Sequence, residues 1–363
     1  MTRIVILGGG YAGAEAASRL GRRGIPVTLV DAGAGLVERV RLHQIAAGDD
    51  IWPVPFKRLF GDAPVTVVRD RVVAIDRRAR RVRTESGEIA YDRLVYALGS
   101  TVDLDSVSGV REHALSLSGP AAAGRIRERL GTSKRAIVVG GGLSGVEIAA
   151  EIAERWPSLE VAIVAAGKIG PRLSASADLY LRETLTSRGV RLHDDTIVTE
   201  VRRDGVVANG EMLHADAVIW CGGMRVSSIA REAGLQTNEI GQILVGDDLR
   251  TSDPDIYAIG DAARFRNLGM QCATALPMGA YVADALAGIA DGPFRFAYAV
   301  TCISLGRNDG IIQMKNPDDT PRERFLSGRP AAWVKELICR YAVMSVRMER
   351  AGLRYRWPKP IAA

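Results

Sequence analysis

Three features are missing from this 363-residue sequence, and each absence excludes a class of protein. No uninterrupted apolar run approaches the ~18–20 residues that a membrane-spanning helix needs. The N-terminal apolar run of residues 4–7 leads directly into glycines, which is not the pattern of a secretory signal peptide. The cysteines lie far apart, at Cys221, Cys272, Cys302 and Cys339, without a C-x-x-C pair. We therefore expect a cytoplasmic protein with neither a disulfide framework nor a bound metal.

Net charge is nearly absent from the first 321 residues. Residues 322–363 carry ten Lys or Arg and three Glu, which gives +7 against +6 for the whole chain, so the remainder carries about −1. The basic character belongs to one C-terminal segment and not to the fold. We therefore expect no nucleic-acid partner.

The first thirty residues contain a glycine motif between two predicted strands. Residues 2–7 form a short apolar strand, residues 11–23 favour a helix, and residues 26–31 form a second strand that ends in Asp31. The turn between the first strand and the helix reads Gly8-Gly9-Gly10-Tyr11-Ala12-Gly13. This order of elements predicts a β-α-β unit with parallel strands.

The spacing of this motif suits a dinucleotide. Gly8 permits the tight turn, Gly10 lets the backbone approach a pyrophosphate, and Gly13 allows the helix to pack closely on the sheet. The helix N-terminus supplies free N–H groups and the positive end of a dipole. Asp31, 18 residues beyond Gly13 (31 − 13), stands where a carboxylate binds ribose hydroxyls.

The same unit recurs 132 positions later (140 − 8). A strand is predicted over 136–139, a helix over 146–155 and a second strand over 159–164, and the turn reads Gly140-Gly141-Gly142-Leu143-Ser144-Gly145. An internal repeat of this length predicts two homologous domains.

The second unit lacks the acid that ends the first. Ala165 stands in its place, and Lys168 and Arg172 follow within a few residues. Without a carboxylate, a 2′-phosphate is not repelled, and the two cations either pair with it or are solvated loop charges. We therefore expect NADPH to be used at least as well as NADH.

The remaining sequence predicts antiparallel hairpins and a small C-terminal part. Three β-branched segments, at 65–68, 72–75 and 81–84, resemble an antiparallel meander, and residues 197–219 repeat that character. Further along, the patterns predict a helix over 278–290, strands over 297–305 and 311–314, and a basic amphipathic helix over 332–350. The predicted class is α/β, with two Rossmann-like dinucleotide-binding domains in a glutathione-reductase-like arrangement, antiparallel β-meanders and a small C-terminal α+β segment.

The order of the motifs resembles that of the two-dinucleotide-binding-domain flavoproteins. The motifs are GGGYAG, Asp31, Ala97-Leu98-Gly99, GGGLSGVE, Trp220-Cys221-Gly222-Gly223 and, most specific of all, Ile256-Tyr257-Ala258-Ile259-Gly260-Asp261. Within that group the chain is most similar to the type II NADH:quinone dehydrogenases and their ferroptosis-suppressor and apoptosis-inducing-factor relatives. The resemblance implies FAD in a first domain of residues 1–115 and 241–290. It also implies NAD(P)H in a second domain of residues 116–240, followed by a C-terminal domain of residues 291–363.

The resemblance also implies which residues hold the cofactors. For FAD they are Gly8, Gly10, Tyr11, Ala12, Gly13, Asp31, Ala97, Gly99, Gly260, Asp261 and Met278. For NAD(P)H they are Gly140, Gly142, Leu143, Ser144, Gly145, Ala165, Lys168, Arg172 and Gly222. Asp261 would accept hydrogen bonds from the ribityl chain. Residues 275–279 would precede a helix whose positive end faces the flavin and stabilises its anionic reduced ring.

Two residues are candidates for a catalytic role. Glu147 matches a family glutamate near the nicotinamide, and the alternative is an ordinary first-turn residue favoured by the helix dipole. His43 is a candidate proton donor near the flavin, although an isolated histidine in a helix is more often packed or solvated. Where the quinone dehydrogenases carry glutamine, this chain has Leu276, Pro277 and Met278, which removes a hydrogen-bond donor to a quinone.

These features predict an FAD-dependent NAD(P)H oxidoreductase. A hydride would pass from the nicotinamide to the flavin, and the electrons then to a quinone-like or other small organic acceptor. Two alternatives stay open, a flavin-dependent tailoring redox enzyme of secondary metabolism and a non-enzymatic NAD(P)H redox sensor. We expect a monomer or a homodimer.

The helix predicted over 332–350 is amphipathic. At about 100° per residue, one broad face holds Trp333, Val334, Leu337, Ile338, Tyr341, Met344 and Met348, and the opposite arc holds Lys335, Arg340, Arg347 and Arg350. The apolar face is expected either to dock on an anionic membrane surface or cap the active site, or to pack on the FAD domain or across a dimer. Docking would make the protein peripheral on the inner face of the membrane.

Overall fold

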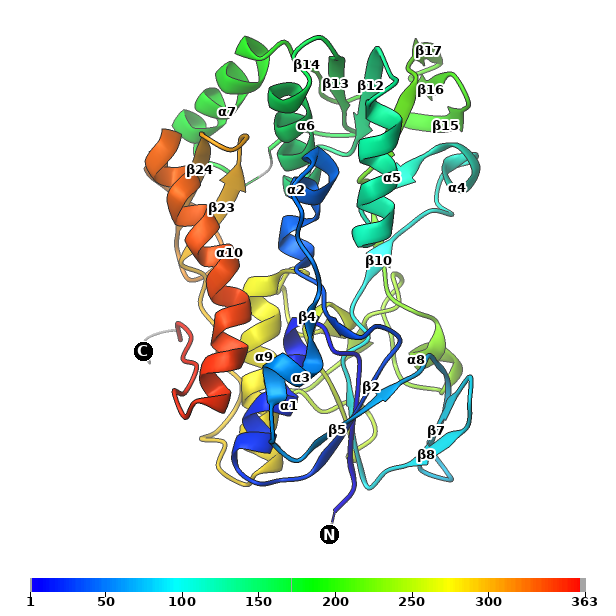
Figure 1. Ribbon diagram of the computed structural model, residues 1–363, viewed down its shortest axis with the longest axis vertical. Coiled ribbons are helices and arrows are strands. Elements are labelled where there is room, and N and C mark those ends of the chain that lie inside the picture. The colour runs from blue at the N-terminus through cyan, green and yellow to red at the C-terminus, as the bar shows by residue number, and fades with distance from the viewer. Residues whose placement is uncertain (1, 171, 360–363) are drawn as a thin grey trace.

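Two five-stranded parallel sheets form the centre of the molecule, which is a computed structural model describing residues 2–170 and 172–359. The first sheet has the order β21-β9-β1-β2-β5 and lies in the lower half of Figure 1, and the second has the order β11-β18-β12-β13-β14 and lies in the upper half. Their strands are β1 (Ile4–Leu7), β2 (Val27–Asp31), β5 (Val65–Arg69), β9 (Arg93–Tyr96), β21 (Ile256–Ala258), β11 (Leu115–Ser116), β12 (Arg135–Val139), β13 (Glu160–Val164), β14 (Arg191–His193) and β18 (Ala217–Trp220). The predicted α/β class with two Rossmann-like units is confirmed.

The sequence of the central strands explains why they are covered on both faces. All four residues of β1, Ile-Val-Ile-Leu, are buried, and so are the last four of β12, Ala-Ile-Val-Val. A parallel sheet that is covered on both faces needs continuous apolar strands, and the second sheet is covered by helices on one face and by β15 and β16 on the other. The helices are α1 (Tyr11–Arg22), α2 (Leu42–Ala47), α3 (Phe56–Phe60), α4 (Val110–His113), α5 (Pro120–Leu130), α6 (Leu143–Arg155), α7 (Ala175–Ser187), α8 (Ile229–Glu232), α9 (Cys272–Leu286) and α10 (Gly328–Arg350), with short 3₁₀ turns η1 (Arg39–Arg41) and η2 (Gly260–Ala262).

Antiparallel strands surround the two sheets. They form two three-stranded meanders, β6 (Val72–Asp76), β7 (Arg81–Thr84) and β8 (Glu88–Ala90), and β15 (Val198–Arg202), β16 (Gly205–Ala208) and β17 (Glu211–His214). Two antiparallel ladders have two strands each, β3 (Gly35–Leu36) with β4 (Val54–Pro55) and β10 (Thr101–Val102) with β19 (Met224–Arg225). A third two-stranded ladder, β20 (Ile243–Leu244) with β22 (Ala263–Arg264), is parallel.

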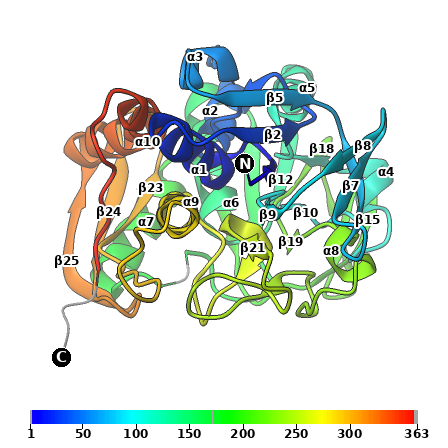
Figure 2. The ribbon, with the colours of Figure 1, turned by 90° about the horizontal axis from the view of Figure 1, so that it is seen from below.

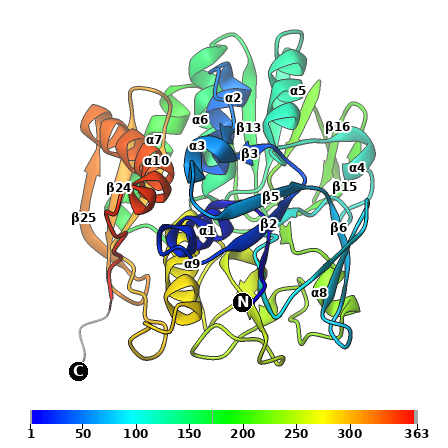
Figure 3. The same ribbon diagram turned by 60° about the horizontal axis from the view of Figure 1, so that its bottom comes forward.

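The prediction that residues 65–68 belong to the first meander is wrong. They lie in β5, which pairs in parallel with β2 at the edge of the first sheet, in the register Val27↔Val65. Figure 3 shows β5 beside β2, with β6 leading away from them. A short β-branched run predicts a strand but carries no information about its partner, so the pattern could not separate β5 from the hairpin that follows.

The C-terminal part is a three-stranded antiparallel sheet followed by a long helix. Its strands are β23 (Val300–Ser304), β24 (Gly310–Lys315) and β25 (Pro321–Ser327), and β25 had not been predicted. Helix α10 then runs back along α1, as Figure 2 shows. The Ser18 hydroxyl of α1 donates to the Val346 carbonyl of α10 over 2.8 Å.

A buried arginine joins three helices at this contact. Arg19 of α1 is completely buried, and its guanidinium donates to Asp284 of α9 over 2.8 and 2.9 Å. It also donates to Glu349 of α10 over 2.7 Å. A buried charge needs such partners, because desolvation would otherwise exclude it from the core.

The apolar face predicted for the last helix is not the face that packs on the protein. Trp333 is 67% exposed, and Leu337, Ile338, Tyr341 and Met344 are between 40% and 49% exposed. The buried side of α10 instead carries Ala331, Cys339, Ala342, Val343, Ser345, Val346 and Glu349. The expectation that the apolar face packs on the FAD domain is therefore wrong, because the opposite face of α10 is the buried one. Most of the buried residues are small, which lets α10 approach α1 closely. Among the described residues, no helix combines the length and apolar character that crossing a bilayer requires.

Candidate functional site

The first glycine-rich turn is closed on the protein side and open on the other. Gly8 has φ +96°, and a Cβ atom there would lie 2.3 Å from the Ala97 carbonyl oxygen. A Cβ atom on Gly13 would lie 1.9 Å from the Gly8 carbonyl oxygen, whereas one on Gly10 would meet nothing within 4 Å. The space over Gly10, at the N-terminus of α1, is where a pyrophosphate would fit.

Asp31 is held beside this turn. Its Oδ2 atom accepts a hydrogen bond of 2.6 Å from the Gly9 nitrogen, and its Oδ1 atom accepts one of 2.7 Å from the Gly33 nitrogen. Each oxygen keeps a lone pair for a ribose hydroxyl. Tyr11 begins α1, next to Ala12, and its buried hydroxyl has no partner among the described residues. We call the turn of residues 8–13 together with Asp31 the first cradle. A buried polar atom without a partner, on the first residue of the helix that follows this turn, fits a site that a polar ligand completes.

The second turn repeats this geometry. Gly140 has φ +118°, and a Cβ atom there would lie 2.8 Å from the Cys221 carbonyl group and 3.0 Å from the Gly222 nitrogen. A Cβ atom on Gly145 would lie 1.9 Å from the Gly140 carbonyl oxygen, and one on Gly142 would meet nothing within 4 Å. Leu143 and Ser144 form the start of α6 above this open space.

The residues expected to select the nicotinamide cofactor lie beside the second turn. Ala165 is buried and follows β13 directly. The Lys168 ammonium lies 2.9 Å from the Asp178 carboxylate, and Arg172 pairs with Asp319. Each basic side chain therefore has an acidic partner. Both are also more than half exposed, so they remain accessible to a ligand.

A third group of the expected residues lines the carboxyl end of the first sheet. Ala97 and Gly99 follow β9, and Gly260 and Asp261 form η2 just after β21. Asp261 accepts a hydrogen bond of 2.6 Å from the Ser100 hydroxyl. The adjacent strands β9 and β21 therefore bring these two motifs to the same edge.

The helix near this edge begins earlier than the sequence indicated. Helix α9 starts at Cys272 and contains Pro277, so residues 275–279 lie inside it and do not precede it. Met278 is buried, and a Cβ atom on Gly279 would lie 2.2 Å from the Ala12 carbonyl oxygen, so α9 packs tightly on α1. Pro277 is the sixth residue of α9, where its ring nitrogen cannot donate the usual hydrogen bond to the carbonyl four residues earlier, so a proline that normally marks a helix start lies inside this helix. The free N–H groups of α9 lie near Cys272.

Glu147 forms a buried ion pair with Lys335 of α10, a partner that the sequence analysis did not predict. Its Oε1 atom lies 2.8 Å from Nζ of Lys335 and accepts a hydrogen bond of 3.1 Å from the Ser304 nitrogen. Burial opposes its negative charge, but Lys335, His43 and these hydrogen bonds outweigh burial and lower the pKa of Glu147. Burial lowers and Glu147 raises the pKa of Lys335, and the net effect is upward, so the pair is ionised.

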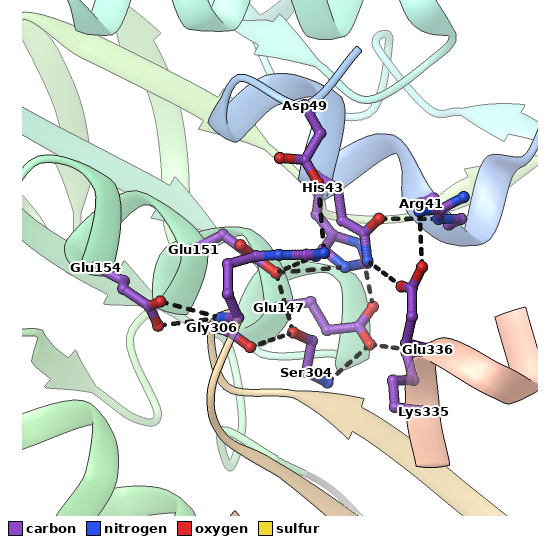
Figure 4. A network of polar contacts seen from close by, with 12 residues as sticks. Arg41, His43, Asp49, Glu147, Glu151, Glu154, Ser304, Gly306, Lys335 and Glu336 are labelled. Atoms are coloured by element: carbon purple, nitrogen blue, oxygen red, sulfur yellow. Dashed lines mark hydrogen bonds and ion pairs between the residues drawn. The ribbon is translucent and has the colours of Figure 1, made fainter. Parts of the chain in front are cut away.

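Lys335 was predicted on the arc opposite the apolar face, with no partner named for it, and in the structure it is turned toward the protein. Its side chain is only 11% exposed, and Figure 4 shows it directed at the Glu147 carboxylate. Helical periodicity defines arcs but not which arc meets the protein, so this contact between residues 188 positions apart (335 − 147) left no signal in the sequence. Lys335 also lies near the start of α9: burial raises the pKa of Cys272 while Lys335 lowers it.

His43 lies on α2, between two carboxylates of α6. Its Nδ1 atom is 3.6 Å from Glu147 and its Nε2 atom is 3.9 Å from Glu151 (Figure 4). Burial outweighs the attraction of Glu147 and lowers the pKa of His43 to about 4, so the imidazole is neutral at pH 7. His43 is thus a packed residue and also part of the polar cluster around Glu147.

The paired glycine cradles define the class of protein as two-dinucleotide-binding oxidoreductases. Residues 2–279 match the model of the pyridine nucleotide-disulphide oxidoreductases, and the chain belongs to this family. It is 29% identical over 376 residues to an NADH dehydrogenase-like protein of Mycobacterium tuberculosis, covering 93% of each chain. It is 27% identical over 394 residues to a type II NADH:quinone oxidoreductase of Staphylococcus haemolyticus, covering 95% of this chain and 96% of that one.

A solved structure shares the whole fold. NDH2 of Plasmodium falciparum in complex with NADH superposes with a TM-score of 0.80 at 13% identity, over 96% of this chain and 98% of that one. The family resemblance of the sequence is confirmed by these comparisons.

Proposed function

We propose that this protein is an FAD-dependent NAD(P)H oxidoreductase that reduces a quinone-like or other small organic acceptor. The observation that carries the proposal is the pair of open glycine cradles together with the Glu147–Lys335 ion pair on the helix of the second cradle. The relatives named as NADH dehydrogenase-like proteins and NADH:quinone oxidoreductases support the same reaction class.

FAD fits the first cradle. Gly8, Gly10 and Gly13 would admit its pyrophosphate, Asp31 its adenine ribose and Asp261 its ribityl chain. When bound, FAD supplies the capacity to take a hydride from the nicotinamide and to pass two electrons to an acceptor. The protein's part is to hold both partners and to control the protons.

The second cradle would hold NAD(P)H. Its open glycine is Gly142, and the buried Ala165 presents no carboxylate to a 2′-phosphate. Lys168 and Arg172 are exposed enough to turn toward such a phosphate, in competition with Asp178 and Asp319. We expect NADPH to be used at least as well as NADH.

Lys335 would give the acceptor a hydrogen-bond donor. Residues 276–278 carry no amide side chain, and they are buried inside α9. Lys335 keeps three donor protons, and Glu147 occupies one side of its ammonium group. A carbonyl oxygen that accumulates negative charge on reduction is stabilised by a cation at this position.

The test is a comparison of acceptors with the purified yellow protein. Steady oxidation of NAD(P)H with menadione, faster than with oxygen alone, supports the proposed function. Slow turnover with every quinone, together with a persistent charge-transfer band, supports a redox sensor. Turnover with a distinct organic substrate but not with quinones supports the tailoring enzyme.

The exposed face of α10 would bring the protein to an anionic membrane. Trp333, Leu337, Ile338 and Met344 form an exposed apolar strip, and Arg340 beside it is 67% exposed at its side chain. An aromatic and aliphatic strip flanked by arginine suits the headgroup region of a bilayer. Such contact would deliver the protein to a lipid-soluble acceptor.

A further inference from the structure

A line of titratable groups leads from Glu147 toward the surface of the protein and ends at the permanently charged Arg307. The groups follow one another as Glu147, His43, Glu151 and Arg307, with separations of 3.6, 3.9 and 3.6 Å between nearest nitrogen and oxygen atoms. His43 and Glu151 are buried, whereas the Arg307 side chain is 40% exposed. Figure 4 shows Glu147 and Glu151 of α6 on either side of His43 of α2. The line ends at Arg307, in the turn between β23 and β24.

We propose that His43 and Glu151 carry a proton between the surface at Arg307 and the Glu147–Lys335 pair while the acceptor is reduced. The proposal rests on the proposed function and adds a route for one proton. His43 and Glu151 act through Glu147, so they are positioning residues for that proton.

The balance of the reaction requires such a route. A hydride brings two electrons and one proton, whereas reduction of a quinone to a hydroquinone consumes two electrons and two protons. The second proton comes from water. The Glu147 carboxylate is buried, so a proton needs intermediate groups to reach it.

The state of His43 suits the role. A neutral imidazole takes a proton at one nitrogen and releases one from the other, which a charged imidazole cannot do. Nε2 of His43 is buried and has no hydrogen-bond partner among the described residues. The gaps of 3.6 and 3.9 Å are closed by a small side-chain rotation or by one bridging water.

Glu151 has the chemistry of a proton donor at neutral pH. Burial raises its pKa to about 7, although Arg307 and the Ser304 hydroxyl oppose the shift. The Ser304 hydroxyl donates to Oε1 of Glu151 over 3.0 Å and fixes that oxygen beside Arg307. A carboxyl group with a pKa near the working pH gives and regains a proton with little free-energy cost.

The outer end of the line reaches solvent through charged residues. Nη2 of Arg307 lies 3.4 Å from Asp49, which is 40% exposed at its side chain, and the Arg307 backbone nitrogen donates to Glu154 over 3.1 Å. The other charges facing His43 are Lys335 of α10 and Arg41, at the N-cap of α2, which is paired with Glu336. On α5, Arg127 is directed at Asp50 beyond the end of α2.

The experiment separates the two half-reactions of the holoenzyme. In a stopped-flow instrument, NAD(P)H first bleaches the flavin absorbance, and a water-soluble benzoquinone then restores it in H2O or D2O. Only the second step takes up a proton from solvent, which a pH-indicator dye follows. His43→Leu and Glu151→Gln are expected to slow that step and its proton uptake by at least about tenfold, and to leave the bleaching step within about twofold of wild type.

Controls and outcomes make the result specific. Glu151→Asp keeps a titratable group and is expected to recover most of the rate, and Glu160→Gln makes the same change on the surface without effect. If wild type is not reoxidised by quinones, the proposed function fails. If wild type is reoxidised and both relay variants match it in rate, proton uptake and isotope effect, the relay alone is overturned. His43→Gln, which is polar but not titratable, replaces His43→Leu if the latter does not fold.

A measurement without substrate tests the protonation state directly. Histidine labelled with ¹⁵N reports all four histidines, and His43 is assigned by its absence from the His43→Leu spectrum. A neutral His43 ring between pH 8 and 6 supports the relay. A charged ring at pH 7 overturns it, because both nitrogens would then already carry protons.

Discussion

Asp31 and Ala165 occupy equivalent positions in the two sheets. Asp31 follows Val30, which pairs with Leu7 of β1, and Ala165 follows Val164, which pairs with Val139 of β12. The acid of the first unit binds the Gly9 nitrogen, and the second unit has a methyl group at that place. The same fold element would therefore present a carboxylate to a ribose in the first cradle and a methyl group in the second.

Restoring the acid is expected to shift the choice of nicotinamide cofactor. In Ala165→Asp, a carboxylate would repel the 2′-phosphate and accept hydrogen bonds from a 2′-hydroxyl. We expect the ratio of kcat/KM for NADH over NADPH to rise by at least about tenfold, or ~1.4 kcal/mol. Wild type should use NADPH at least as well as NADH, so a wild-type preference for NADH above tenfold would contradict the role given to Ala165. Lys168→Ala is the companion variant and should weaken NADPH only.

Removing the Asp261 carboxylate is expected to weaken FAD retention. The side chain is fixed by the Ser100 hydroxyl and is free to accept hydrogen bonds from a polyol. Loss of hydrogen bonds to a charged group costs about 1.5–3 kcal/mol, so Asp261→Ala should weaken FAD binding by roughly tenfold to a hundredfold. Isothermal titration of the deflavinated protein measures this. Full flavin content and unchanged affinity in Asp261→Ala would show that Asp261 does not bind FAD. Ser100→Ala keeps the carboxylate and should therefore weaken FAD binding less.

Breaking the Glu147–Lys335 pair is expected to destabilise the fold. Lys335→Met leaves a buried carboxylate without its cation, which costs about 3–5 kcal/mol. Urea unfolding measures the loss. The double variant Glu147→Gln/Lys335→Met removes both charges and should recover much of the stability. Equal losses in the single and double variants would show that the pair does not couple.

The stability of two relay variants is expected to depend on pH in opposite ways. The pKa of His43 is lowered from 6.5 to about 4, so between these values the unfolded chain takes up a proton that the native protein does not, and stability falls as pH falls. The pKa of Glu151 is raised from 4.5 to about 7, so between these values stability falls as pH rises. In wild type the two effects cancel between about pH 4.5 and 6.5.

Each single variant should uncover the other residue's effect. The unfolding free energy of His43→Leu is expected to fall with rising pH, and that of Glu151→Gln to rise, each by up to about 1.4 kcal/mol per pH unit relative to wild type. Urea titrations at half-unit steps from pH 4.5 to 6.5 measure both slopes. Parallel slopes in the three proteins would show that neither group has a shifted pKa.

The exposed strip of α10 is expected to bind anionic vesicles. Trp333→Ser with Leu337→Ser and Met344→Ser should abolish co-sedimentation with anionic vesicles at low salt, while wild type binds them and does not bind neutral ones. These side chains face solvent, so the variant should keep its fold and its flavin. Deleting the helix is a poor test, because its inner face carries Glu349, the partner of Arg19. If wild type does not co-sediment with anionic vesicles at low salt, the strip has no membrane role.

Local sequence patterns were enough to predict the two β-α-β units. Glycine spacing, apolar strands and the terminal acid all act within about thirty residues, and the structure contains both units at the expected places. The close contact between Gly13 and Gly8 also follows from this local spacing, whereas the contact of Gly8 with Ala97 depends on a strand remote in sequence.

Contacts between distant segments could not be predicted in the same way. The pairing of β5 with β2, the start of α9 before Pro277 and the inner face of α10 each depend on a partner remote in sequence. Lys335 shows the consequence most clearly. Its neighbours along α10 are Val334 and Glu336, with the buried Ala331 and Cys339 one turn away, and only the folded chain reveals that Glu147 is its partner.

Helix α10 acts as a brace between the two nucleotide-binding units. Near its start Lys335 is bound to Glu147 of α6, and near its end Glu349 is bound to Arg19 of α1. Figure 1 shows α10 extending from the upper to the lower part of the molecule. The two attachments are 14 residues apart (349 − 335), or about 21 Å along the helix axis. A hinge motion that separated the units would break one buried pair at a cost of about 3–5 kcal/mol, so such an open form is populated below about one percent. The two cradles are therefore held at a fixed separation, and a nucleotide would enter and leave each of them without a hinge motion between the units.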